Sequence, residues 1–304
     1  MPVLALSRPV KKLAAAVLFP FLYLLACAFW AAVAAYPIYI LFGNGDAGFF
    51  RSLVGRGGQA FLILGLFPMV RTLGLRTADL GLQRDFPRQF GIGWVLGILM
   101  LLVHLSSLVV LEVRAVNEWV FRDGGRLLSI LVKATVTGAT VALLEETIFR
   151  GVLFAALRKL TGAWSTVVIS AFYFAALHFI RARWTPDPAE IGWGTAFRVV
   201  IDGFAQLANL PVDSFLALFL AGILLGVIRA GFPRGLGYCM GLHAGWVLVI
   251  KSAKPLVREI PDADWGFLVS SYDRFIGFLS AGWMALLILG FVFFTRGRTV
   301  RDEG

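Results

Sequence analysis

Long apolar runs are the feature that most constrains this chain. A helix needs about 20 apolar residues to cross the core of a bilayer, and a window of that length predicts eight spans in the sequence. They cover approximately residues 13–42, 58–75, 90–112, 130–157, 163–181, 214–230, 235–251 and 273–295. Because a helix satisfies its own backbone hydrogen bonds in lipid, the predicted fold class is all-α, a polytopic membrane helix bundle.

The composition agrees with a membrane protein. The chain is 59% hydrophobic and 15% charged, whereas soluble domains are about 45–50% apolar and about 25% charged. We therefore predict one membrane domain over residues 1–304, with the lipid bilayer as a partner. The longest connection, residues 182–213, contains several Trp and Phe residues, and we predict an interfacial or partly re-entrant segment there.

Net charge and its distribution bear on partners and orientation. The formal charge of +10 would suggest nucleic acid in a soluble protein. In a membrane protein, Lys and Arg flank the spans and contact anionic headgroups, so we predict no nucleic acid. Both ends of the chain are basic, with Arg8, Lys11, Lys12, Arg296, Arg298 and Arg301. An even number of spans with these basic ends predicts both termini in the cytoplasm, and the Ala-, Gly- and Arg-rich composition suggests a bacterial inner (plasma) membrane.

Two adjacent carboxylates, Glu145 and Glu146, lie inside the fourth predicted span. Ionisable groups at membrane depth persist only where they pair or carry function. With about 100° per residue on a helix, Glu146 and Arg150 project to nearly the same side and predict an i,i+4 ion pair. Glu145 points about 140° away from Arg150, so its helix does not supply a counter-charge. A carboxyl in such a site can exchange protons, which makes Glu145 the candidate general base.

Two histidines lie in later predicted spans. His178 follows Phe174 by one helical turn in the fifth span, and His243 lies in the seventh. A single histidine in a span is more often a helix-to-helix hydrogen bond than a catalytic group, and His104 in the third span keeps that interpretation. Counting about 1.5 Å per residue from the cytoplasmic ends, Glu145, His178 and His243 reach depths that are compatible with one cluster.

Three motifs in this order resemble the CPBP family of CAAX-processing type II prenyl endopeptidases and bacteriocin-processing or self-immunity (ABI) proteins. Glu145-Glu146 with Arg150 resembles its Glu-Glu-x-x-x-Arg motif, Phe174 with His178 its Phe-x-x-x-His motif, and His243 its third histidine motif. The resemblance covers approximately residues 130–250, and we predict a catalytic core at 130–251.

The resemblance implies an intramembrane endopeptidase that hydrolyses a peptide bond in a membrane-associated protein or peptide. It implies that Glu145 activates a water molecule, that His178 assists and that His243 stabilises the oxyanion. The chain departs from the family at Val247, where Asn or Asp commonly stands four residues after the histidine. Trp246 has an indole N–H nearby, but it projects about 100° from Val247 and we do not count it as a replacement here.

Several alternatives remain open at the sequence level. Glu145, His178 and His243 could instead bind zinc, since zinc hydrolases use three protein ligands and an open position; we favour a mechanism without a metal cofactor. Because Val247 stands where the family commonly has Asn or Asp, a non-catalytic immunity or scaffold protein is an alternative. A proton-coupled transporter ranks last, because the sequence shows no inverted repeat.

Overall fold

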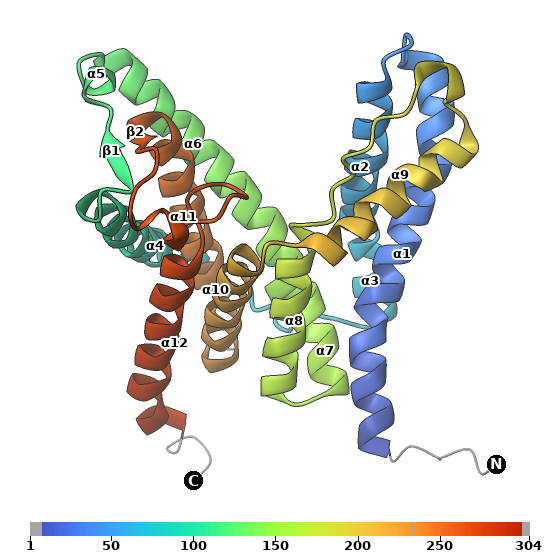
Figure 1. Ribbon diagram of the computed structural model, residues 1–304. Helices are drawn as coiled ribbons and strands as arrows, with labels where there is room; N and C mark the ends of the chain where they lie inside the picture. Colours follow the sequence, from blue (N-terminus) through green and yellow to red (C-terminus); the bar gives the residue numbers. More distant parts are fainter. Residues whose placement is uncertain (1–7, 233, 300–304) are drawn as a thin grey trace, which may run out of the picture. The chain divides into compact units, whose positions relative to one another are not determined.

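The computed structural model describes residues 8–232 and 234–299. It is 78% helical, which confirms the all-α class (Figure 1). The terminal arginines behind the predicted orientation, Arg8, Arg296, Arg298 and Arg301, have side chains outside the described residues. Contacts divide the chain into two compact units. Unit 1 comprises the described residues up to Leu75 with Ala156–Leu210, and unit 2 comprises Arg76–Ala155 with the described residues from Pro211 onward.

Each of the eight predicted spans contains a helix. In chain order the helices are α1 (Arg8–Phe42), α2 (Ala47–Leu64) with α3 (Leu66–Thr72), α4 (Phe86–Val110), α6 (Gly124–Glu146) continuing into α7 (Phe154–Leu160), α8 (Ala163–Leu177), α10 (Val212–Gly231), α11 (Leu236–Leu256) and α12 (Phe278–Thr299). Within the described residues, six segments are long and apolar enough to cross a membrane. The protein is therefore an integral, multi-pass membrane protein.

Several predicted boundaries were wrong, the start of the second span most of all. The second span begins at Ala47 rather than near 58, because the Asp46 carboxylate caps the helix by accepting from the backbone N–H groups of Gly48 and Phe49. The fifth span ends at Leu177 rather than near 181. His178 is consequently the C-cap residue of α8, and does not lie inside the helix as predicted.

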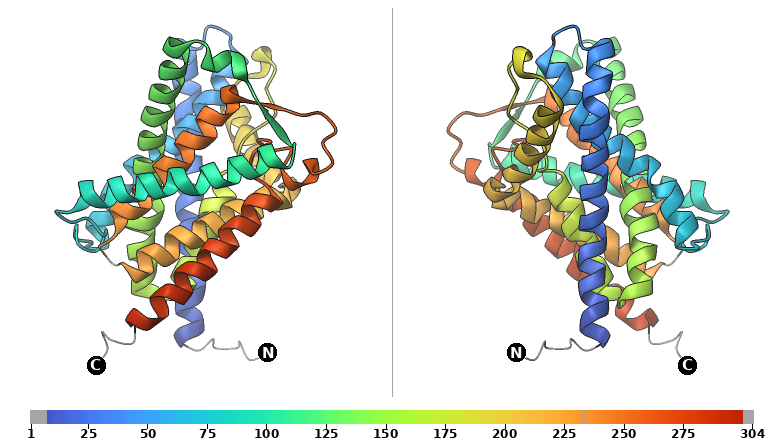
Figure 2. Two further views of the ribbon diagram at one scale, coloured as in Figure 1. Left: turned by 90° about the vertical axis from the view of Figure 1, so that its left-hand side faces the viewer. Right: turned by 90° about the vertical axis from the view of Figure 1, so that its right-hand side faces the viewer.

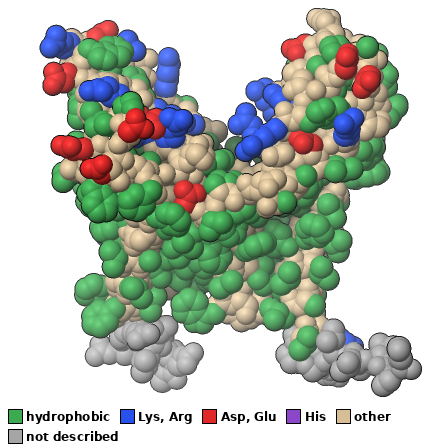
Figure 3. Space-filling view, viewed as in Figure 1, with side chains coloured by type: hydrophobic (Ala, Val, Ile, Leu, Met, Phe, Trp, Pro, Cys, Tyr) green, Lys and Arg blue, Asp and Glu red, His purple; other side chains and the backbone are tan. Residues whose placement is uncertain are grey.

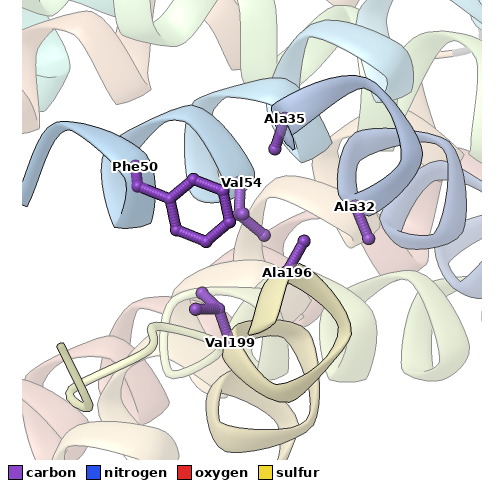
Figure 4. Packing of buried hydrophobic residues seen from close by; sticks show 6 residues of the cluster. All are labelled: Ala32, Ala35, Phe50, Val54, Ala196 and Val199. Atoms are coloured by element: carbon purple, nitrogen blue, oxygen red, sulfur yellow. The ribbon is translucent and has the colours of Figure 1, made fainter. Parts of the chain in front are cut away.

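Unit 1 packs α1 and α2 against α9 (Trp193–Ala205). Ala32 and Ala35 of α1, Phe50 and Val54 of α2, and Ala196 and Val199 of α9 form one buried cluster (Figure 4). The connection predicted to be interfacial therefore contains a helix that packs on two long helices, flanked by the short 3-10 turns η2 (Pro188–Glu190) and η3 (Gln206–Asn209).

Unit 2 packs α11 against α4 and α6, and α10 runs beside α12 (Figures 1 and 2). Glycines make these contacts close: a Cβ added to Gly138 of α6 would lie 2.7 Å from the Ala244 carbonyl oxygen of α11. Small residues allow this approach of helix backbones in lipid. The remaining elements are α5 (Glu118–Phe121), the 3-10 turn η4 (Gly266–Leu268), and the antiparallel strands β1 (Arg114–Val116) and β2 (Val257–Glu259), which pair Arg114 with Glu259.

Charged side chains are unevenly distributed over unit 2. On the face shown in Figure 3 they gather around β1, β2 and α5, whereas hydrophobic side chains cover most of the rest of this unit. Arg274 bonds Glu259 at 2.6 Å at this polar end, where both side chains are exposed. The distribution agrees with a bundle that presents an apolar surface to lipid and a polar end to water.

Substituting the glycines between α4 and α11 should destabilise the fold. A Cβ at Gly241 would collide with the Phe90 carbonyl group, and one at Gly97 with the Leu242 carbonyl group. We expect Gly241→Ala and Gly97→Ala each to lower the free energy of unfolding by about 1–3 kcal/mol, measured as a lower melting temperature in detergent. Gly91→Ala is the matched control on α4, because nothing lies within 4 Å of its added Cβ. An unchanged melting temperature in all three variants would contradict the packing.

Candidate active site

The two adjacent carboxylates lie where α6 changes into a π-helix. α6 ends at Glu146, and the π-helix η1 (Thr147–Leu153) leads into α7. At the junction, the Thr147 hydroxyl donates a hydrogen bond to the Leu143 carbonyl oxygen at 2.6 Å. A π-helix is rare and occurs frequently at functional sites. The helix geometry therefore changes immediately after the carboxylates.

Glu146 is fully buried and binds two side chains. Its Oε1 atom lies 3.1 Å from Nη1 of Arg150 and 2.9 Å from Nδ1 of His243. Arg150 is also fully buried, and its Nη2 donates to the Gly222 carbonyl oxygen of α10 at 3.1 Å. Buried charges are stable only when they are paired and hydrogen-bonded. The Glu146 carboxylate thus links η1 to α11, and Arg150 extends the link to α10.

A second arginine ties the backbone of η1 to α10. The Nε of Arg229 donates to the Arg150 carbonyl oxygen at 3.1 Å, and its Nη2 donates to the Asp79 carbonyl oxygen at 2.8 Å. Gly81 has φ +85, and a Cβ there would lie 2.7 Å from Cζ of Arg229. Arg150 of η1 therefore donates to the backbone of α10, and Arg229 of α10 donates to the backbone of η1.

The hydrogen bond from Glu146 fixes the orientation of the His243 ring. A carboxylate only accepts hydrogen bonds, so Nδ1 of His243 carries the hydrogen. The other ring nitrogen, Nε2, lies 3.9 Å from Oε2 of Glu145. The hydrogen bond to Glu146 thus sets both the tautomer and the orientation of the His243 ring. In this orientation, Nε2 faces Glu145.

The two carboxylates have different environments. The side chain of Glu145 is 30% exposed, whereas that of Glu146 is 0% exposed. Glu146 contacts Arg150 and His243, and Glu145 faces the Nε2 edge of His243. The Glu145 side chain is therefore the partly exposed one of the two, and its Oε2 atom, which faces His243, is buried.

His178 and Phe174 belong to unit 1 and are placed by their contacts there. Nδ1 of His178 lies 2.7 Å from the Phe174 carbonyl oxygen, and the two rings are in edge contact with centroids 4.9 Å apart. A carbonyl only accepts, so Nδ1 carries the hydrogen, and Nε2 of the neutral ring is an acceptor. His178 is half-buried.

The donors available to a metal are few. Within the described residues, no group of three or more His, Cys, Asp or Glu side chains is arranged to hold a metal ion. In unit 2, Nε2 of His243 and the Glu145 carboxylate are the candidate donors, because Glu146 is engaged by Arg150 and His243. A zinc hydrolase uses three protein ligands, so a zinc ion would need one further ligand.

The remaining predicted residues have structural contacts. Nε2 of His104 lies 3.2 Å from the Phe275 carbonyl oxygen, so this histidine bonds a loop rather than another helix. The contact between Glu146 and His243 was missed by sequence reasoning, which paired Glu146 with Arg150 alone. The two residues are 97 positions apart, and helical periodicity carries no signal at that separation.

Removing the guanidinium of Arg150 should destabilise the protein strongly. Arg150→Met leaves the buried Glu146 carboxylate without its cationic partner, and we expect a loss of about 3–5 kcal/mol in the free energy of unfolding. Thermal unfolding in detergent measures the loss. The double variant Glu146→Gln with Arg150→Met removes the buried charge and should recover part of it. A double variant that is less stable than Arg150→Met would contradict the ion pair.

Comparisons with known proteins point to the same segment of the chain. A family model described as type II CAAX prenyl endopeptidase Rce1-like matches residues 127–249, the segment from α6 to α11 that contains both glutamates, Arg150, His178 and His243. No curated protein and no solved structure matches the chain. The match supports a protease of the CAAX type in the membrane. Residues 127–249 therefore match an Rce1-like family model of the type II CAAX prenyl endopeptidases, in agreement with the resemblance that the three motifs predicted.

Proposed function

We propose that this protein is an intramembrane endopeptidase that uses Glu145 to activate a water molecule. The observation that supports it is the partly exposed Glu145 side chain, whose Oε2 atom lies 3.9 Å from Nε2 of His243, and the ring of this histidine is held by a fully buried Glu146. The Rce1-like match covers the same residues. The arrangement combines a carboxylate on a partly exposed side chain with a histidine of fixed orientation, which suits general-base hydrolysis.

The proposed reaction adds one water molecule across a peptide bond. The Glu145 carboxylate accepts a proton from water while the water oxygen bonds to the scissile carbonyl carbon, and the π electrons of the carbonyl move to its oxygen. When the intermediate collapses, the C–N bond breaks and protonated Glu145 returns its proton to the departing nitrogen. One acid and one amine are released. The general base contributes about 10²–10⁴-fold to such a rate.

His243 is assigned to the oxyanion. To donate from Nε2, the ring must carry a hydrogen on both nitrogens, and the Nδ1 hydrogen is already directed at Glu146. Glu146 is then a positioning residue, which orients the ring and supplies negative charge beside it. Donors that are fixed before the reaction stabilise a developing oxyanion most effectively.

His178 is assigned to assist the attacking water. Its Nδ1 hydrogen is held by the Phe174 carbonyl oxygen, and we assign the step of accepting a hydrogen from water to the other ring nitrogen, Nε2. Phe174 supports this role by fixing the ring through both its carbonyl group and its aromatic edge. The orientation of His178 is therefore set within α8 itself.

The substrate we propose is a membrane-anchored protein or peptide, since the carboxylates lie within a membrane-spanning helix. We also propose that both termini are cytoplasmic and that the membrane is a bacterial inner membrane. Both statements rest on the basic ends of the chain and on its composition.

A non-catalytic role is the second candidate, and Val247 favours it. This residue lies one helical turn after His243 and offers no hydrogen-bond donor. A protein of this kind would keep the Glu146–Arg150–His243 cluster for stability and act as an immunity or scaffold protein. It would retain biological activity when Glu145 is replaced.

Glu145→Gln should abolish proteolysis without unfolding the protein. Glutamine keeps the shape of this partly exposed side chain but cannot accept the proton of water, so we expect a fall in kcat of at least about 10²-fold. The measurement is cleavage of a farnesylated CAAX reporter peptide by purified protein in proteoliposomes. Glu118→Gln, at an exposed glutamate of α5, is the matched control. Equal cleavage by Glu145→Gln and the wild type would rule out the mechanism.

Chelation should leave the activity intact. Because the proposed base is a carboxylate and no metal is used, dialysis against a strong zinc chelator is expected to change the cleavage rate by less than about twofold. Metal content measured by mass spectrometry should be well below one ion per chain. Activity that is lost on dialysis and restored by added zinc would favour the zinc mechanism instead.

A further inference from the structure

Trp246 carries a buried hydrogen-bond donor for which the described part of the chain provides no acceptor. Its side chain is 5% exposed, and its Nε1 atom has no hydrogen-bond partner among the described residues. Buried tryptophans usually find a partner for this N–H, and an orphaned buried donor costs stability and needs an explanation. An acceptor that is present only when substrate is bound would provide one.

The position of this donor is next to the histidine of the candidate site. Trp246 follows His243 by three residues on α11, so the two side chains lie on neighbouring turns of one face. Their ring centroids are 6.3 Å apart at an angle of 50°. On the other flank of His243, one turn along, Val247 supplies only methyl groups.

We propose that Trp246 is a catalytic residue, whose indole N–H donates to the substrate carbonyl oxygen as it becomes an oxyanion. The inference rests on the proposed function, because it takes His243 as the first donor to the same oxygen. Trp246 and Val247 flank His243 at about 60° and about 40° on opposite sides. A donor at 246 therefore lies on the flank of His243 opposite to 247.

The indole N–H should stabilise the transition state more than it stabilises the bound substrate. An oxyanion is a stronger acceptor than a neutral carbonyl oxygen, so a fixed N–H stabilises it more than it stabilises the ground state. An interaction made only in the transition state lowers kcat when it is removed and leaves KM nearly unchanged. The same N–H makes no hydrogen bond to any residue that the structure describes, so its removal should not weaken the fold.

The test uses the full-length protein in proteoliposomes with the farnesylated CAAX reporter peptide. The first variant is Trp246→Phe. The second replaces Trp246 by 3-benzothienylalanine, which exchanges the N–H for sulfur and keeps the shape of the ring. We expect kcat to fall by about 10²-fold in both, with KM within about threefold of the wild type and an unchanged melting temperature for the benzothienyl protein. Trp265→Phe, at a tryptophan that is 48% exposed, is the matched control.

A rescue experiment separates hydrogen bonding from packing. Val247→Asn adds an amide donor on the other flank of His243. In the Trp246→Phe background it should recover at least about tenfold in kcat, because an amide N–H can serve the same oxyanion. A purely structural tryptophan would give a lower melting temperature, and the asparagine would not restore activity.

The outcomes distinguish this proposal from the proposed function. If the wild type cleaves the reporter, Glu145→Gln does not, and the benzothienyl protein keeps the wild-type kcat, the role of Trp246 is overturned while the general-base mechanism stands. If the wild type cleaves the reporter and Glu145→Gln cleaves it equally fast, the proposed function fails and the role of Trp246 fails with it. A selective fall in kcat with rescue by Val247→Asn supports both.

Discussion

The buried carboxylate of Glu146 is the interaction on which the candidate site depends. It contacts Arg150 one turn away and His243 on α11, and both charged side chains of the ion pair are removed from solvent. Breaking a buried pair by removing one partner is costly, because the other charge is left uncompensated. The same carboxylate therefore stabilises the bundle and orients the histidine. The stability of the bundle and the orientation of the histidine therefore depend on one group, which explains how a charged cluster is tolerated within an apolar helix.

This arrangement requires helices that approach closely. α11 lies against α4 and α6 through glycines that face backbone atoms of the neighbouring helix, such as Gly138 against Ala244. The short distance brings His243 within reach of Glu146, and the arginines from η1 and α10 complete the contacts. Because lipid provides little hydrophobic force between helices, close packing and polar contacts hold such bundles together. The glycines and the charged cluster thus both act on the contact between α6 and α11.

Much of the fold could be predicted because the signal for a span is local. A run of apolar residues identifies a membrane helix whatever its neighbours are, and each of the eight predicted runs contains a helix. The ends were less predictable. The start of α2 depends on the Asp46 cap, and the end of α8 leaves His178 at a C-cap. The π-helix after Glu146 gave no sequence signal, since its residues resemble those of the α-helix before it.

The sequence by itself determined the class of the protein, the i,i+4 pairing of Glu146 with Arg150, and the divergence of Glu145 from that pair. All three follow from hydrophobicity or helical periodicity within a few residues. Only the tertiary structure decided which carboxylate holds His243, because Glu146 and His243 are 97 residues apart and meet through helix packing. The burial of Trp246 beside His243 is of the same kind. Helical periodicity predicts which face of a helix a residue lies on, whereas the packing of neighbouring helices determines which residues contact that face.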